Sequence, residues 1–441
     1  MTRANLRPGS LGAALLAIGL FAGCAARYET SVRHDLARAA PRSRGAEAAP
    51  APRDGRLESY VTLALAASPE LRERYARWRA ETLRIAPARA LPDPMIGYAF
   101  FALPLDVQRH RLMASQSFPW PTRLTAAADA QSARAAAAQL RFEARALDVA
   151  ARVADAWWRL WLVERVARVW REQLELLGGL AESLRARLEA SEATLAELAR
   201  VELSRARLAD AIDGLDEQAQ AARAALRAAV GGELPEDARA EGEPALGLPA
   251  ESAAALADAV RAHPFLRSFE RLAEAGDDAA RAAEGARFPS FTVGVEWTDG
   301  MPMPGNTDPM LGLQVALTIP LWQEAYDDAQ RAAEADAEAE RAAGASAELD
   351  ALAELAAALS EVRDADRRAR VTERTLLPQA QSAFESVIGA YTVGRASVAD
   401  LQLAQRELLE LAVELERARA EHGRAWARLE RVVGRRVARA E

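Results

Sequence analysis

Residues 311–322 read LGLQVALTIPLW, and this stretch decides the fold. As far as Ile319, its large apolar residues alternate with glycine, alanine or polar residues, which is the period-two pattern of a strand with one apolar face. A tilted strand of about nine residues is long enough to cross a bilayer. The stretch therefore predicts a strand over residues 310–319 whose apolar face can meet lipid.

Three more windows carry strand signals, and the four windows fall into two pairs. Residues 95–103 pair with residues 111–118, and residues 291–299 pair with residues 310–319, each pair across a polar or Gly/Pro-rich loop. Aromatic residues at the strand ends are candidates for membrane-interface girdles: Phe100, Phe118, Trp120, Trp297 and Trp322. The alternative is two hairpins in an ordinary sandwich core. Small, polar residues on one face of each strand, and too few strands for a second sheet, argue against it.

The segments around these strands occur twice, about 200 residues apart. Residues 67–72 (ASPELR) return as residues 262–267 (AHPFLR), and residues 193–198 (ATLAEL) return as residues 396–401 (ASVADL). A tandem duplication explains this offset, so we expect one architecture built from two equivalent halves. The predicted organisation is a lipoprotein signal peptide over 1–23, a flexible tether over 24–56, a first repeat over 57–230, a linker over 231–249 and a second repeat over 250–435.

Each predicted hairpin is followed by very long helices. Residues 122–230 contain no proline, and residues 321–433 contain only Pro378. The expected long helices cover residues 122–190, 195–230, 321–391 and 397–434. At 1.5 Å per residue the first of them would reach about 100 Å, which is longer than a compact globular domain requires. The predicted fold class is mainly α with a small β part.

The composition excludes several classes of function. The 64 acidic residues outnumber the 56 basic ones, the net charge is −8, and the two signs are interspersed, so nucleic acid is not an expected partner. Every basic residue is arginine, which excludes a Walker-type phosphate loop and any lysine-based mechanism. The four histidines are scattered without metal-ligand spacing, and no nucleophile and base stand together. We therefore expect no enzyme, no metal and no cofactor.

The first residues are typical of an export signal. Arg3 and Arg7 precede an apolar stretch over residues 11–22 that is too short to span a bilayer. Cys24 follows and is the only cysteine, so no intrachain disulfide can form. Its position resembles the bacterial lipobox, although Phe21 stands where leucine is usual. The resemblance implies a covalent lipid on Cys24, with an unmodified thiol as the alternative.

Four strands cannot close a membrane barrel alone, because the smallest barrels have about eight strands and open edges are not tolerated in lipid. Several copies must therefore share one barrel. Two chains would give eight strands with a filled interior, and three would give twelve with room for a lumen.

From about residue 57 to residue 435 the chain resembles the TolC-like outer-membrane efflux family, in its lipoprotein branch. The resemblance lies in the order and duplication of short motifs: residues 68–69 and 263–264 (SP and HP), 91–94 (LPDP), 116–121 (QSFPWP), 319–321 (IPL), 376–378 (LLP) and 391–401 (YTVGRASVADL). It implies a homotrimer with a twelve-stranded β-barrel in outer-membrane lipid, continued by an α-helical barrel in the periplasm. It also implies docking to a periplasmic adaptor (membrane fusion protein) and an inner-membrane pump.

The resemblance also assigns roles to the turns between the long helices. It places Asp400, and Glu197 as its equivalent in the first repeat, in a periplasmic gate, although Leu403 stands where a second acid would fall. Three Asp400 carboxylates around one axis would repel each other and attract cations. The alternative for both residues is a solvated helix acid. The expected adaptor-docking tip consists of Ser191, Thr194, Gly394, Arg395 and Ser397.

The predicted function is a passive trimeric duct that exports small molecules or metal cations across the outer membrane as part of a tripartite efflux system. The alternative is a lipid-anchored periplasmic coiled-coil scaffold or adaptor without a pore. The exported substrate, the partner pump and the resting state of the tip stay open.

Overall fold

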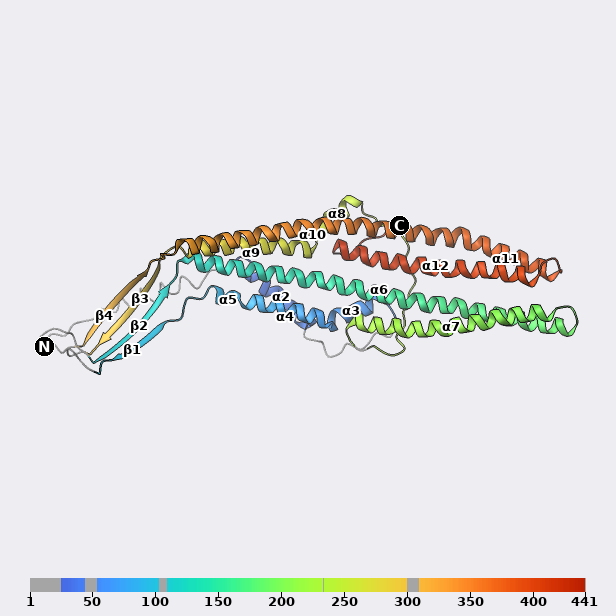
Figure 1. Cartoon of the computed structure of the whole chain (residues 1–441), viewed down its shortest axis with the longest axis horizontal. Coiled ribbons are helices and arrows are strands. Elements are labelled where there is room, and N and C mark those ends of the chain that lie inside the picture. The colour runs from blue at the N-terminus through green and yellow to red at the C-terminus, as the bar shows by residue number, and fades with distance from the viewer. Residues whose placement is uncertain (1–24, 44–53, 103–108, 233, 300–308, 441) are drawn as a thin grey trace. The chain divides into compact units, whose positions relative to one another are not determined.

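The computed structural model describes residues 25–43, 54–102, 109–232, 234–299 and 309–440. In chain order the helices are α2 (Glu29–Ser43), α3 (Leu57–Ala67), α4 (Pro69–Leu83), α5 (Ile85–Ala88), α6 (Pro121–Glu189), α7 (Leu195–Val230), α8 (Ala253–Arg261), α9 (Pro264–Gly285), α10 (Gln323–Val371), the π-helical turn η1 (Thr372–Leu376), α11 (Leu377–Thr392) and α12 (Val398–Val433). The strands are β1 (Met95–Phe100), β2 (His110–Phe118), β3 (Ser290–Thr298) and β4 (Met310–Thr318) (Figure 1). The predicted fold class, mainly helical with a small sheet, is confirmed.

The chain divides into two compact units, and neither corresponds to one predicted repeat. The sheet unit comprises the described residues of 1–39, 75–141 and 267–345, and the helical unit comprises those of 40–74, 142–266 and 346–441. Each unit therefore takes corresponding parts of both repeats. The boundaries expected at residues 57–230 and 250–435 mark a duplication in the sequence and not two separate bodies.

The four strands form one antiparallel sheet in the order β1-β2-β3-β4. The hairpins β1–β2 and β3–β4 come from the first and second repeat, and β2–β3 joins them, with Phe118 opposite Phe291 and Arg111 opposite Thr298. The second strand of the first repeat thus pairs with the first strand of the second repeat inside the sheet unit. This central pairing explains why the repeats do not fold as separate domains.

The helical unit has two main apolar clusters. One gathers Trp157 and Trp161 of α6 with residues of α3, α7 and the segment 234–240, and the other gathers Trp426 of α12 with residues of α8 and α10. The buried indoles also donate hydrogen bonds, Trp157 Nε1 to the Gly55 carbonyl at 2.8 Å and Trp161 Nε1 to the Gly242 carbonyl at 3.0 Å. The bond to Gly242 fixes the linker between the repeats onto α6, and the bond to Gly55 fixes the segment just before α3 there.

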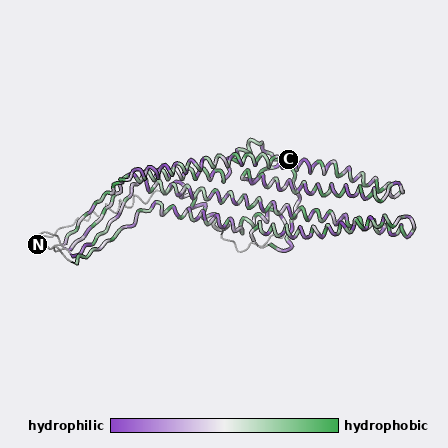
Figure 2. Tube along the Cα trace, in the orientation of Figure 1, coloured by the Kyte–Doolittle hydropathy of each residue, from purple (hydrophilic) through white to green (hydrophobic). Residues whose placement is uncertain are grey.

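Hydrophilic and hydrophobic residues are interleaved along the long helices (Figure 2). Among the helices of the described residues, none has both the length and the hydropathy that crossing a membrane requires.

Two predicted segments differ from the structure. The tether expected over residues 24–56 contains α2, because contacts with other parts of the sheet unit fix it: Val32 is buried, and the Glu29 carboxylate accepts a hydrogen bond from Arg89 Nη1 at 2.5 Å. The helix expected over residues 321–391 is interrupted by η1 just before Pro378. Proline has no N–H for the helical ladder, and the π-turn locally changes the ladder so that the Leu377 N–H donates to the Thr372 carbonyl.

Candidate functional site

The sheet has one mostly apolar face, and the strand register assigns its residues strand by strand. Directly opposed residues share a face, and so do alternate residues along one strand. Following the pairing from β4 to β1 places these apolar residues together, and we call them the apolar sheet face: Leu311, Leu313, Val315, Leu317, Phe291, Val293, Val295, Trp297, Leu112, Ala114, Phe118, Ile96, Tyr98 and Phe100. The same register places two polar residues of β2 on this face, Gln116 opposite Val293 and His110 opposite Phe100. Ile96 is 79% exposed and Leu313 is 76% exposed. A patch of this extent on a folded chain marks a surface that lipid or a partner covers.

The opposite face, the polar sheet face, carries small and polar side chains. It includes Ser115 and Ser117 of β2, Thr292 of β3, and Gln314 and Thr318 of β4. An ion pair joins Arg111 Nε to Glu296 Oε1 at 3.0 Å on this face. One face of the sheet is therefore suited to an apolar environment and the other to water.

Both outer edges of the sheet are open within the described residues. β1 pairs only with β2, and β4 pairs only with β3. Such edges present unpaired N–H and C=O groups, and in hydrocarbon each unsatisfied group costs several kcal/mol. The apolar face cannot be placed in lipid unless these edges find partners.

The predicted interface aromatics lie toward the two ends of the sheet. Phe100 and Trp297 are near the strand ends that lead into the hairpin loops, and Phe100 packs against His110 with ring centroids 5.4 Å apart. Phe118, Trp120 and Trp322 are near the ends that lead into the long helices, and the Trp120 ring stacks on Phe288 at 5.0 Å. Trp322 is 77% exposed. Their role as a girdle stays a prediction.

The two turns between long helices repeat one capping design. Thr194 begins α7 and Ser397 begins α12, each in a capping box with the residue three positions later. The Thr194 N–H and hydroxyl donate to Glu197 Oε2 at 2.7 and 2.9 Å, and the Ser397 N–H and hydroxyl donate to Asp400 Oδ2 at 2.9 and 2.7 Å. The two candidate gate acids thus share one local structural role.

These hydrogen bonds favour the charged form of both acids. The bonds from Thr194 hold the pKa of Glu197 below its usual value, the backbone bond first, and those from Ser397 do the same for the pKa of Asp400. Asp400 is exposed, and Leu403, one turn further along α12, is 65% exposed. The acids are ionised at neutral pH, as a cation-attracting ring would require. The gate itself stays a prediction.

The remaining tip residues adopt turn conformations. Ser191 and Gly394 have positive φ angles of 61° and 73°, and Arg395 is exposed. One contact at these turns has no signal in the sequence. Arg187 Nη1 donates to the Tyr391 hydroxyl at 2.9 Å, and the guanidinium lies 5.2 Å from the centroid of the Tyr391 ring. It links the α6 end to the α11 end, and only the folded chain brings these distant positions together.

The remaining sequence-based expectations concern the lipidation site and metal binding. Cys24, the predicted lipidation site, lies outside them. In the part of the chain that the structure describes, no group of three or more His, Cys, Asp or Glu side chains is arranged to hold a metal ion.

Comparison with known proteins supports the channel architecture. Residues 255–435 match the family model described as "Outer membrane efflux protein". The outer membrane efflux protein BepC of Brucella suis biovar 1 (strain 1330) is 26% identical over 274 residues, which are 60% of this chain, and the match spans 58% of BepC.

Among solved structures, the chain is similar in fold to CusC, with a TM-score of 0.71 and 16% identity over 87% of this chain and 93% of CusC. It is also similar to VceC of Vibrio cholerae, with a TM-score of 0.69 and 20% identity over 86% of this chain and 96% of VceC. The predicted resemblance to the TolC-like outer-membrane efflux family is confirmed.

Proposed function

We propose that this chain, a member of the outer membrane efflux protein family, is one subunit of a trimeric duct that carries small molecules or metal cations out through the bacterial outer membrane. The family consists of channel proteins of the outer membrane, and in this proposal the duct is passive and catalyses no reaction. Transport energy comes from an inner-membrane pump, reached through a periplasmic adaptor.

One observation carries the proposal: a four-stranded sheet with an exposed apolar face and two open edges. The apolar face suits hydrocarbon, and the polar face suits water. The backbone groups of β1 and β4 need partners in lipid, and the matching edges of further copies supply them. Pairing β4 of one copy with β1 of the next closes the ring without any free edge.

Three copies fit this requirement better than two. Eight strands leave an interior that side chains fill, whereas twelve strands leave room for an aqueous lumen. The polar sheet face, with Ser115, Thr292 and Gln314 on it, suits a water-filled interior. The 69-residue helix α6 is about 100 Å long at 1.5 Å per residue, as a duct extending through the periplasm requires.

The tip turns are the proposed contact with the adaptor. Both combine an exposed, polar backbone turn with a capped helix start, and both repeats supply the same arrangement. Three subunits would therefore offer six similar turns. A lipid on Cys24 would add an anchor in the outer membrane.

The subunit count and the pore are tested together on the purified protein. In detergent, native mass spectrometry should show three copies, and the same preparation should give ion conductance in planar bilayers. A monomer, or a trimer that never conducts, would sink the proposal.

A second experiment separates the duct from a scaffold that is held at the membrane only by its lipid. A Cys24→Ser chain exported with a cleavable signal should still require detergent for extraction, because the apolar sheet face holds it in the membrane. Recovery of this variant in the soluble periplasmic fraction would favour the scaffold.

A further inference from the structure

The residues directly after Cys24 are fixed to the sheet unit. The Arg27 N–H donates to Asp129 Oδ1 at 2.8 Å, and the Arg27 guanidinium pairs with the buried carboxylate of Asp278 at 3.3 Å. The Tyr28 hydroxyl donates to Glu274 Oε2 at 2.6 Å. These bonds attach the segment to α6 and α9 over two successive residues. Whatever precedes Arg27 therefore begins at a defined place in the sheet unit.

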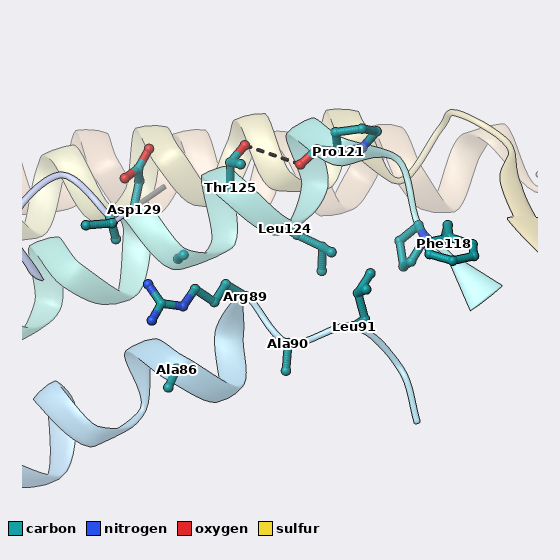
Figure 3. A pocket seen from close by; sticks show the side chains of 13 residues that line it. Ala86, Arg89, Ala90, Leu91, Phe118, Pro121, Leu124, Thr125 and Asp129 are labelled. Atoms are coloured by element: carbon teal, nitrogen blue, oxygen red, sulfur yellow. Dashed lines mark hydrogen bonds between the residues drawn. The ribbon is translucent and has the colours of Figure 1, made fainter. Parts of the chain in front are cut away.

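A cavity of about 510 Å³ lies at that place, and Ala25 and Ala26 form part of its wall. We call it the Ala25 pocket. Most of the remaining wall is hydrocarbon: Ala90, Leu91, Phe118, Pro119, Pro121 and Leu124. Leu124 comes from the start of α6, and Leu91 comes from the segment after α5 (Figure 3).

The polar groups of the Ala25 pocket already have partners. Arg89 Nη1 pairs with Glu29 Oε2 at 2.5 Å, and Asp129 accepts the Arg27 N–H. The Thr125 hydroxyl donates to the Pro121 carbonyl at 3.3 Å (Figure 3). A polar ligand would have to displace these bonds. A hydrocarbon chain needs no hydrogen-bond partner and gains from leaving water.

The Ala25 pocket also continues the apolar sheet face. Phe118 belongs to both, since it lies in the wall of the pocket and opposite Phe291 in the β2–β3 pairing. The pocket therefore lies where the proposed lipid-facing surface meets the first turns of α6. An acyl chain in the pocket would lie at the edge of the proposed lipid-facing surface, next to the first turns of α6.

We propose that the Ala25 pocket holds one fatty acyl chain of the lipid carried by Cys24. The occupant follows from chain position, because Cys24 directly precedes Ala25, which lies in the pocket wall. The inference rests on the lipid-anchored form of the proposed function. The lipid would then pack between the sheet and the helices of the sheet unit, in addition to anchoring the protein in the membrane.

Photocrosslinking of the full-length, lipidated protein in native membranes tests the proposal. Leu124 is replaced by the photoreactive residue p-benzoylphenylalanine, and cells are fed an alkyne-bearing fatty acid. Thr122 carries the same probe in the matched control, because residues two apart on a helix point in nearly opposite directions, and Thr122 is exposed and not part of the pocket wall. A probe at Ala90 repeats the test from the other side of the pocket if the Leu124 substitution lowers assembly.

After illumination and digestion, the N-terminal lipopeptide should be joined to the α6 peptide within a single chain. The joined product should be lost with the Thr122 probe and in a Cys24→Ser chain. A membrane phospholipid on residue 124, a product of two-chain mass, an unlipidated Cys24, or no product from either pocket probe would each overturn the proposal. Conductance of the same preparations reports separately on the duct, so the two proposals can fail independently.

Discussion

At the scale of single residues, the tip acids show how a local role and a proposed functional role can coincide. Asp400 completes a capping box, and the same ionised carboxylate is the proposed cation-attracting group of the gate. Ser397 takes part in the cap but carries no charge. The pair therefore allows the two roles of Asp400 to be measured separately.

We expect Asp400→Asn to reduce block of the conductance by divalent cations, because it removes three charges from one ring of the trimer. Ser397→Ala keeps the charges and removes the capping hydroxyl, so it should leave the block nearly unchanged. Planar-bilayer recordings with Mg²⁺ on the tip side provide the measurement. Equal loss of block in both variants would mean that the cap, and not the charge, controls the tip.

Close packing at Gly423 of α12 gives a second prediction at this scale. A Cβ at this position would overlap the indole of Trp158 on α6, so Gly423→Ala should destabilise the protein by about 1–3 kcal/mol. Gly389 of α11 has no atom within 4 Å of its would-be Cβ, so Gly389→Ala should stabilise by about 0.5–1 kcal/mol through helix propensity. Denaturant unfolding of both variants in detergent checks the opposite signs. A stable Gly423→Ala protein would contradict the packing.

At the scale of elements, β4 offers adjacent positions on opposite faces of the sheet. Val315 lies on the apolar sheet face and is 67% exposed, and its neighbour Gln314 lies on the polar sheet face. Arginine on a lipid-facing strand costs about 2–4 kcal/mol at the bilayer midplane. We therefore expect Val315→Arg to reduce strongly the yield of assembled trimer in outer membranes, and Gln314→Arg to be tolerated. Equal yields would show that the apolar face does not meet lipid.

The elements also show what could be predicted from the sequence. Alternation along residues 311–319 and the lack of proline after Thr122 were enough to predict β4 and α6, because these signals are local. Helix α2 was missed because its Ala- and Arg-rich residues carry no apolar period. It is held by contacts with distant segments, such as those of Glu29 with Arg89 and of Asp35 with Gln139. Local patterns do not encode contacts between distant segments.

The candidate site followed the same division. The two faces of the sheet could be read from the strand windows, but the neighbour of each hairpin could not, since period two assigns faces and not partners. The capping boxes had a visible signal, a Ser or Thr three residues before an acid. The Arg187–Tyr391 contact had none, because it joins residues that only the fold brings together.

At the scale of the whole molecule, we expect the proposed adaptor to bind the tip turns and not the sheet unit. Arg395 is exposed in the turn before α12. Arg331 is an exposed arginine on α10 in the sheet unit, where it pairs with Asp328 at 3.3 Å, and it serves as the control position. Arg395→Glu should weaken co-purification of the periplasmic adaptor while leaving conductance intact, and Arg331→Glu should affect neither. If Arg395→Glu captured the adaptor as well as the unchanged protein does, the docking surface would lie elsewhere than this turn.

The β2–β3 pairing also governs the order of events during biogenesis. Each hairpin can form from neighbouring residues, but Phe118 meets Phe291 only after α6 to α9 have been translated and exported. Closing so long a loop is slow, so the central ladder forms late. Until the ladder forms, each hairpin exposes its apolar surface, and intermediates of this kind are prone to aggregation. We therefore expect a holdase that shields both halves until the central ladder forms to raise the yield of the assembled protein.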